Sequence, residues 1–379
     1  MRQLETIPSG QHSVPNLILQ PQMPLFRPDI TGFRRHDLAE KLIEIGLNPS
    51  LVKPLWNGVY VKGATEFSQI LALSRKHQLR LTDHFTIGRP TIVRDLISRD
   101  RTRKWLLQFP DGNRVESVMI PEHDRGALCV SSQVGCTLSC TFCHTGTMKL
   151  VRNLSVTEIV AQVLNARDGL SEWGKKRSDC VCTNIVLMGM GEPLFNFDNV
   201  SAALQIIMDG DGLGISRRRI MLSTAGVVPM IKRVGIELGV NLAISLHAVT
   251  DELRDELVPL NKKYPLQELL AACRDYPAAS NARRITFEYV MLKDVNDSDA
   301  DARELVRLLQ GIHAKVNLIP WNPWPGAVYQ VSTQNRIQSF ARIINDAGYS
   351  SAVRASRGED IMAACGQLKS DSEHAVFTR

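Results

Sequence analysis

The sequence lacks the segments that would place a protein in or across a membrane. No apolar run approaches the roughly 20 residues that a transmembrane helix needs. Residues 1–10 also lack the apolar stretch of a secretory signal peptide. We therefore expect a cytoplasmic protein with no membrane partner, in which disulfides are not the default use of the eight cysteines. Hydrophobic residues make up 44% of the chain and charged residues 22%, as is typical of a soluble globular core.

A strong excess of one charge is also missing, because the net charge is only +6 over 379 residues. The basic residues are nevertheless grouped, although each group alone is typical of a solvated face. The groups are Arg99, Arg101, Arg103 and Lys104; Lys175, Lys176 and Arg177; and Arg217, Arg218 and Arg219. Three such groups in one basic chain indicate a polyanionic partner, and nucleic acid is the natural candidate.

The texture of the sequence divides the chain into four parts. Residues 1–30 form a proline-rich leader, and residues 31–100 carry apolar residues at helical spacing, which predicts a small helical accessory domain. From residue 101 to 368, a hairpin with the turn Asp111-Gly112-Asn113 is followed by short strands that alternate with helices. Residues 369–379 form a tail.

Alternating strands and helices predict a parallel sheet with helical crossovers. We expect parallel strands at residues 128–132, 184–188, 219–223, 241–245, 285–291 and 315–319, with a further strand at 351–355. About six such units predict an α/β fold, namely a partial (β/α)6-type barrel preceded by the small N-terminal helical domain. In such folds, ligands collect at the carboxyl ends of the strands.

Three of the eight cysteines lie in one short segment. Cys136, Cys140 and Cys143 have the spacing C-x3-C-x2-C, which supplies three thiolates and no fourth. An iron–sulfur cubane needs four ligands, so this set would leave one iron open to a substrate or cofactor. A structural zinc site is closed by four ligands, and His144 would complete one poorly because it directly follows Cys143. We therefore favour a cluster over zinc and over unrelated buried thiols.

Polar residues recur at the ends of several predicted strands. They lie in the segments Gly189-Met190-Gly191-Glu192-Pro193, Ser223-Thr224-Ala225-Gly226, Ser245-Leu246-His247 and Pro320-Trp321-Asn322-Pro323-Trp324. Each segment alone is also typical of a tight turn or of structural residues. Together, polar groups at successive strand ends are what a cofactor pocket needs.

Taken together, the motifs resemble a known family. The cysteine spacing with Phe142 before the last cysteine, followed by a Gly-Glu-Pro strand end, looks like a radical S-adenosylmethionine (radical SAM) enzyme. The segments Cys129–Cys136, Gly189–Leu194, Val316–Pro320 and Ala364–Leu368 more closely resemble the RNA adenine methyltransferases of the RlmN/Cfr family. The resemblance covers nearly the whole chain and implies that the partial barrel is a radical SAM barrel.

The resemblance implies a role for each residue of the site. Cys136, Cys140 and Cys143 would hold a 4Fe–4S cluster whose open iron binds S-adenosylmethionine, of which two molecules are used per turnover. Cys365 matches the cysteine that carries a methyl group, Cys129 matches its partner cysteine, and Glu116 matches the position assigned as proton acceptor. The residues that match cofactor-contacting positions are Gly191, Glu192, Ser223, Ser245, Leu246, His247 and Asn322. Without the resemblance, Cys129, Cys180, Cys182, Cys273 and Cys365 would each be interpreted as structural thiols.

The implied chemistry suits an electron-poor carbon. The substrate carbon in this family is C2 of adenine, which a carbon radical can attack although it is a poor nucleophile toward a sulfonium methyl group. One S-adenosylmethionine would methylate Cys365, and a second would supply a radical that takes a hydrogen from that methyl group. The resulting methylene radical would add to adenine. Loss of the C2 proton and attack by Cys129 on the Cys365 sulfur would then release the product and leave a disulfide for an outside reductant. Whether Glu116 or Cys129 takes the proton stays open.

The resemblance also implies substrates and partners. The substrates are an adenosine in 23S rRNA and the adenosine next to the anticodon in certain tRNAs, and an external electron donor such as a flavodoxin-type system is required. We expect a monomer in which lysines and arginines, including Arg75, Lys76 and Arg80 of the helical domain, contact RNA phosphates. Two alternatives remain at this point. One is methylation at adenine C8, which shares the catalytic set, and the other is a non-catalytic, zinc-stabilised RNA-binding protein.

Overall fold

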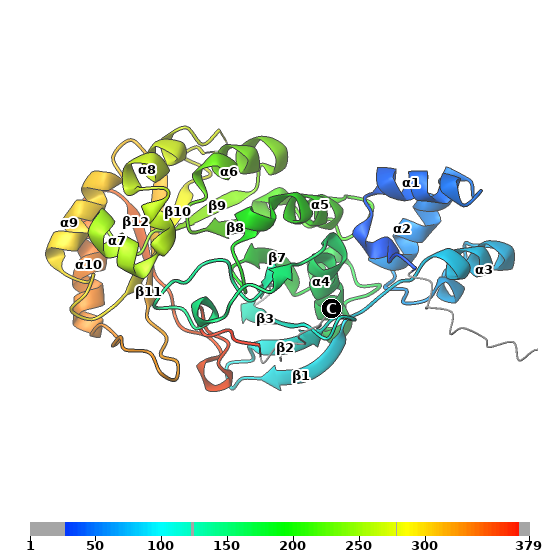
Figure 1. Ribbon diagram of the computed structural model, residues 1–379, viewed down its shortest axis with the longest axis horizontal. Helices are drawn as coiled ribbons and strands as arrows, with labels where there is room; N and C mark the ends of the chain where they lie inside the picture. Colours follow the sequence, from blue (N-terminus) through cyan, green and yellow to red (C-terminus); the bar gives the residue numbers. More distant parts are fainter. Residues whose placement is uncertain (1–26, 123–124, 278, 371–379) are drawn as a thin grey trace, which may run out of the picture.

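The computed structural model describes residues 27–122, 125–277 and 279–370. Most of the leader expected at 1–30 and most of the tail expected at 369–379 lie outside these residues. In the described part, a group of helices near the N-terminus lies beside a larger α/β part (Figure 1). No helix in the described part is both long and apolar enough to cross a membrane.

Three helices form the N-terminal part, as the spacing of apolar residues predicted. They are α1 (Arg35–Glu44), α2 (Val52–Tyr60) and α3 (Arg75–His84). This part docks on α4 (Val156–Gly169), and the contact is so close that a Cβ at Gly32 would lie 2.1 Å from Thr157 Oγ1. Asp29 Oδ2 accepts a hydrogen bond from Gly88 N at 2.8 Å, so the last residues of the expected leader belong to the folded structure.

One ten-stranded sheet runs through the rest of the described chain, in the order β1-β2-β3-β4-β7-β8-β9-β10-β11-β12. Strands β1 to β4 pair antiparallel, whereas β4 and the strands after it in this order pair parallel. The antiparallel part consists of β1 (Thr91–Ile97), β2 (Arg103–Gln108), β3 (Arg114–Glu122) and β4 (Arg125–Cys129). The other parallel strands are β7 (Cys182–Leu187), β8 (Ile220–Thr224), β9 (Asn241–Ser245), β10 (Ile285–Met291), β11 (Ala314–Pro320) and β12 (Ser350–Val353). The predicted hairpin is β2–β3, and the predicted parallel sheet is confirmed.

Helices follow the parallel strands and cover the outer face of the sheet (Figure 1). Besides α4 they are α5 (Phe197–Met208), α6 (Val228–Arg233), α7 (Asp251–Leu257), α8 (Leu266–Arg274), α9 (Asp299–Leu308) and α10 (Gln334–Asp346). Every residue of β10 is buried, as expected of a parallel strand with both faces covered. Helix α7 has seven residues and was not predicted, because so short a segment shows no helical repeat. The fold is the partial barrel that the alternation of elements predicted.

Strand β1 differs from the prediction. It lies inside the range 31–100 that we expected to be helical and accessory, yet it pairs with β2 and forms one edge of the large sheet. All seven of its residues are exposed, so its sequence lacks the alternation of buried and exposed residues that marks a half-buried strand. The sheet therefore begins before the expected boundary at residue 100.

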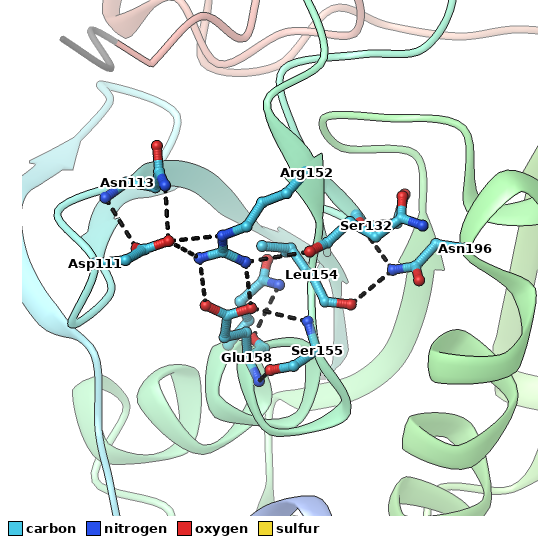
Figure 2. A network of polar contacts seen from close by, with 10 residues as sticks. Asp111, Asn113, Ser132, Arg152, Leu154, Ser155, Glu158 and Asn196 are labelled. Atoms are coloured by element: carbon cyan, nitrogen blue, oxygen red, sulfur yellow. Dashed lines mark hydrogen bonds and ion pairs between the residues drawn. The ribbon is translucent and has the colours of Figure 1, made fainter. Parts of the chain in front are cut away.

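A small second sheet brackets the segment with the three cysteines. It pairs β5 (Gln133–Val134) with β6 (Arg152–Asn153). From β6, Arg152 binds Glu158 at 2.7 Å and Asp111 of the β2–β3 turn at 2.6 Å (Figure 2). A capping box begins helix α4, because Ser155 Oγ accepts from Glu158 N at 3.3 Å and Glu158 Oε2 accepts from Ser155 N at 2.8 Å. Arg152 thus anchors the end of the cysteine segment to the hairpin and to helix α4.

Candidate active site

The carboxyl ends of the parallel strands open into one cavity of about 1050 Å³, a value that includes its open mouth. Most of the residues predicted for the site lie in its wall. They are Cys136, Cys140, Cys143, Gly191, Glu192, Ser223, Ser245, His247, Asn322 and Cys365. Residues that are far apart in the sequence meet here because parallel strands bring their carboxyl ends to the same edge of the sheet. Cys129, Leu246 and Glu116 lie outside the wall.

The three wall cysteines have the spacing of a cluster rather than of a single-ion site. Their thiols are free, and they do not all lie within 4.8 Å of one another; in the described chain, the potential ligands that do are the surface residues His36, Asp37 and Glu40. One zinc ion with Zn–S bonds of about 2.3 Å would hold its thiolates roughly 3.8 Å apart. In a 4Fe–4S cluster each thiolate binds its own iron, which allows the wider spacing. The donor set therefore fits a 4Fe–4S cluster.

Because the three cysteine thiols are desolvated, their thiolate forms need a nearby positive charge to be stable. Desolvation raises the pKa of Cys136 to about 12 and also raises the pKa of Cys140 and Cys143. Bound iron ions would supply the charge that stabilises the thiolate forms. Three further thiols, Cys180, Cys182 and Cys273, are buried away from the cavity wall, as expected for structural residues.

His144 does not line the cavity, and its ring is engaged elsewhere. Its ring stacks on Trp324, with centroids 4.8 Å apart and an interplanar angle of 6°. Its Nδ1 lies 3.3 Å from the carbonyl oxygen of Gln367. The closed four-ligand zinc site that the sequence left open as an alternative is therefore not supported by this geometry.

Glu192 follows strand β7, and backbone amides hold both of its carboxylate oxygens. Oε1 accepts from Leu194 N at 3.0 Å, and Oε2 accepts from Ala225 N at 2.8 Å. Burial raises the pKa of Glu192 to about 7, so an ammonium group in the cavity would favour its charged form. The preceding Gly191 has a φ of +98°, and a Cβ there would lie 2.5 Å from Gln133 Cβ. Glycine is therefore required at this turn.

Gln133 connects the Glu192 turn to the cysteine segment. Its Oε1 accepts from Glu192 N at 3.0 Å and from Thr137 N at 3.1 Å, and its Nε2 donates to Asn153 Oδ1 at 2.8 Å. Thr137 directly follows Cys136, so this one buried amide sets the position of the first cysteine relative to the glutamate. Sequence reasoning missed Gln133, although it lies within the Cys129–Cys136 segment that carried the resemblance.

Arg254 of helix α7 joins the ends of strands β8 and β9. Its guanidinium donates to the carbonyl oxygens of Ala225 at 2.6 Å, Ser245 at 3.1 Å and Leu246 at 3.0 Å. The side chain is fully buried, and burial lowers its pKa to about 10, which leaves it cationic at neutral pH. Leu246, itself fully buried, thus contributes to the site through its backbone. Ser223 at the end of β8 reaches the wall directly.

His247 presents a neutral imidazole to the cavity. Its Nδ1 accepts a hydrogen bond from Val290 N at 3.1 Å, which places the ring proton on Nε2. Burial lowers the pKa of His247 to about 3. The ring also contacts the edge of Phe142, with centroids 4.6 Å apart. His247 therefore offers one N–H donor to a ligand.

The loop that carries Cys365 is bound directly to the cysteine segment and to the segment after β11. Asn322 Nδ2 donates to the carbonyl oxygen of Cys365 at 3.0 Å. His144 N donates to the carbonyl oxygen of Gly366 at 2.7 Å. These hydrogen bonds fix the position of the Cys365 loop relative to the three wall cysteines.

Two tryptophans after β11 hold the cysteine segment from the other side. The indole N–H groups of Trp321 and Trp324 both donate to the carbonyl oxygen of Phe142, each at 3.0 Å. Phe142 lies between the second and third cysteines, so these two hydrogen bonds hold in place the part of the segment that would bind the cluster.

Cys365 and Cys129 lie near each other but in different surroundings. Cys365 is exposed to the cavity, whereas Cys129, at the end of β4, is buried. Protein surrounds the cavity, so desolvation raises the pKa of the Cys365 thiol to about 12, and the nearby charges of Glu288, Cys129 and Cys143 add to this effect. Burial likewise raises the pKa of Cys129 to about 12. Both cysteines are free thiols in the structure.

Glu116 on β3 lies in a separate, smaller cavity. It forms an ion pair with Lys104 at 2.9 Å and accepts a hydrogen bond from Lys369 N at 2.9 Å. Arg94 also lines this smaller cavity. Glu116 is therefore connected to the chain just after Cys365 but does not line the cavity that Cys365 faces.

Glu288 is a wall residue that sequence reasoning did not identify. It lies on the otherwise largely apolar strand β10, where a single carboxylate is the one available signal. Its Oε1 accepts a hydrogen bond from Asn317 Nδ2 at 2.9 Å, and burial raises its pKa.

Comparison with known proteins agrees with this site. The profile of the Radical SAM superfamily matches residues 130–306. A dual-specificity RNA methyltransferase RlmN of Gluconobacter oxydans is 59% identical over 351 residues, which cover 92% of this chain and 86% of that protein. The RlmN of Rhodopseudomonas palustris strain BisB5 is 59% identical over 368 residues, or 94% and 92% of the two chains. The crystal structure of a radical SAM methyltransferase from Sphaerobacter thermophilus superposes with a TM-score of 0.85 at 41% identity, covering 90% of this chain and 99% of that chain.

The two RlmN relatives cover 92% and 94% of this chain, so the similarity is not confined to the barrel. A 4Fe–4S cluster and S-adenosylmethionine are the cofactors of such enzymes, in agreement with the donor set of the cavity. The chain therefore belongs to the RlmN family of dual-specificity RNA methyltransferases, within the radical SAM superfamily.

Proposed function

We propose that this enzyme methylates C2 of an adenine in 23S rRNA and in tRNA next to the anticodon, through an S-methylcysteine on Cys365. The observation that carries the proposal is that Cys365 lines the same cavity as the three loop cysteines. A methyl group on Cys365 would therefore lie in the space where the radical is generated. The dual specificity in the names of the relatives supports two kinds of RNA substrate.

The cavity residues have distinct tasks in this proposal. Cys136, Cys140 and Cys143 hold the cluster, which, with bound S-adenosylmethionine, supplies a carbon-centred radical after one-electron reduction. Glu192 binds the ammonium group of the cofactor. The cofactor-contacting residues Gly191, Ser223, Ser245, Leu246, His247 and Asn322 bind the remainder, some through backbone groups. The largely apolar wall keeps water away from the reacting atoms.

Cys365 and Cys129 act as the carrier and the releasing thiol. Cys365 receives the methyl group, forms the bond to adenine, and is then attacked by the Cys129 sulfur. Cys129 is among the groups close enough to raise the pKa of the Cys365 thiol, which supports this pairing. The acceptor of the C2 proton is Glu116 or Cys129; Cys129 is near the carrier, whereas Glu116 is engaged by Lys104 in the smaller cavity.

RNA approaches beside the turn between β1 and β2. This turn contacts the loop before Cys365, because Asp100 Oδ2 accepts from Gly358 N at 3.1 Å. The adjacent Arg99 and Arg101 are exposed and available to phosphates. By contrast, the run Arg217–Arg219 directly precedes β8. It therefore lies at the amino ends of the parallel strands, opposite the cavity, and is not part of this path.

The proposal also covers the N-terminal helices, the oligomeric state and the electron donor. The N-terminal helices act as an accessory RNA-binding domain through the exposed Arg75, Lys76 and Arg80, ahead of the barrel core and its C-terminal loop. The enzyme works as a cytoplasmic monomer that takes electrons from a flavodoxin-type donor. The adenine must leave its stack to enter the cavity, which favours unpaired bases.

Nucleoside analysis tests the proposal. RNA from a strain that lacks the gene should lose 2-methyladenosine, and the purified, cluster-loaded enzyme should restore it. Loss of 8-methyladenosine with 2-methyladenosine intact would instead support the sister activity at C8. A colourless zinc protein after anaerobic purification would contradict the enzymatic proposal altogether.

A further inference from the structure

The wall of the main cavity contains two carboxylates, Glu192 and Glu288, and their environments differ. Backbone amides occupy both oxygens of Glu192. Glu288 receives one hydrogen bond at Oε1, from Asn317, and no residue in the described part of the chain donates to its Oε2. Glu288 therefore presents an open carboxylate oxygen to the cavity.

The sheet places Glu288 close to the reacting residues. In the parallel register, Glu288 lies beside Ser245 of β9 and Asn317 of β11. Among the charged groups around Cys365, Glu288 acts on its thiol most strongly. The other carboxylate assigned to the site, Glu116, is paired with Lys104 and lines a different cavity.

We propose that Glu288 is a catalytic residue that accepts the thiol proton of Cys365 when this sulfur takes up its methyl group. The inference rests on the proposed function and adds the base for its first half-reaction. The S–H bond of Cys365 breaks, and its proton moves to Glu288 Oε2. The sulfur lone pair forms the new S–C bond, while the bond from the methyl carbon to the sulfonium breaks and S-adenosylhomocysteine leaves. The carboxylic acid afterwards returns its proton to solvent.

The surroundings of Glu288 suit this task. Its burial raises its pKa, whereas Arg354 after β12 and Lys315 on β11 act in the opposite direction. The neutral imidazole of His247, which follows β9, and the Cys365 thiol of the C-terminal loop line the same cavity. The net result is a carboxylate that takes a proton more readily than one at the surface. Desolvation raises the pKa of the Cys365 thiol to about 12, so few thiols ionise at neutral pH and a proton acceptor in the same cavity speeds the transfer.

The test is the methylation of Cys365 in a single turnover without reductant. Enzyme made by cell-free synthesis without S-adenosylmethionine starts unmethylated, and peptide mass spectrometry follows the modification after cluster reconstitution. Glu288→Gln keeps the size and the acceptor for Asn317, and we expect it to slow the transfer about 100-fold at neutral pH. The rate of this variant should rise steadily with pH, because a growing fraction of the Cys365 thiol is ionised. The wild-type rate should level off. Glu304→Gln, on the exposed face of α9, is the matched control and should behave as wild type.

A second variant and a spectroscopic readout keep the test sharp if Glu288→Gln folds poorly. Glu288→Asp retains a carboxylate, so its pH profile should again level off. A protonated-carboxyl band should appear in the infrared difference spectrum of methyl transfer in the wild type and be missing in Glu288→Gln. Equal rates, pH profiles and spectra for Glu288→Gln and wild type would overturn the inference. If the wild type itself never modified Cys365, the proposed function would fail instead.

Discussion

Replacing Arg254 by methionine tests how the cavity edge is built. Arg254 is fully buried and donates to three backbone carbonyls, as well as to Asn261 Oδ1 at 2.8 Å. Methionine fills a similar space but donates nothing, so the oxygens of Ala225, Ser245 and Asn261 lose the guanidinium donor, whereas the Leu246 carbonyl keeps its bond from Ala248 N. Each such acceptor costs about 1–3 kcal/mol when left unsatisfied. The desolvation cost of the buried cation disappears at the same time and offsets part of the loss. We expect a net destabilisation of about 2–4 kcal/mol.

The assay is urea unfolding of the cluster-loaded protein under anaerobic conditions, followed by tryptophan fluorescence. Arg307→Met is the matched control, because Arg307 pairs with Glu304 on the exposed side of α9 and its loss should be nearly neutral. Affinity for S-adenosylmethionine should fall in Arg254→Met alone, since the ends of β8 and β9 lose their common anchor. Equal unfolding midpoints and equal affinities for the two variants would refute this reasoning.

Three further substitutions probe the connections around the cavity. Gln133→Leu removes the acceptor for the amide at the end of β7, so S-adenosylmethionine should bind more weakly in equilibrium dialysis while the cluster still assembles; unchanged affinity would contradict this. Trp324→Phe removes one of two donors to the cysteine segment and should speed the loss of iron to a chelator, compared with Trp173→Phe, whose indole bonds outside the site; equal rates would argue against the clamp. Cys129→Ala should accumulate a covalent RNA adduct on Cys365, seen as a shifted band in denaturing gels, and normal turnover would exclude the release step.

Much of the site was predictable because many of its residues lie in short sequence motifs. The spacing of Cys136, Cys140 and Cys143 suggests a cluster by itself, and the structure brings these residues into one cavity. Polar residues at strand ends such as Glu192 and Asn322 also met where a parallel sheet places them. The alternation of strands and helices predicted the barrel for the same reason, since each crossover returns the chain to the same edge.

The rest depends on contacts that no local pattern records. Gln133, Arg254 and Glu288 act through partners far away in the sequence, and each resembles an ordinary polar residue in its own segment. Strand β1 has no alternation because both of its faces are exposed. The basic run Arg217–Arg219 was identifiable from the sequence. Its position at the amino ends of the parallel strands, away from the cavity, followed only from the fold.

The measurement that tests the central claim most directly uses S-adenosylmethionine with a fully deuterated methyl group. If Cys365 carries the methyl group and loses one hydrogen before transfer, the 2-methyladenosine product should contain two deuterium atoms from the donor. Direct transfer of an intact methyl group would leave three. A product with two deuterium atoms, formed by the wild type and lost in Cys365→Ser, is the result that we predict; a product with three would contradict the account.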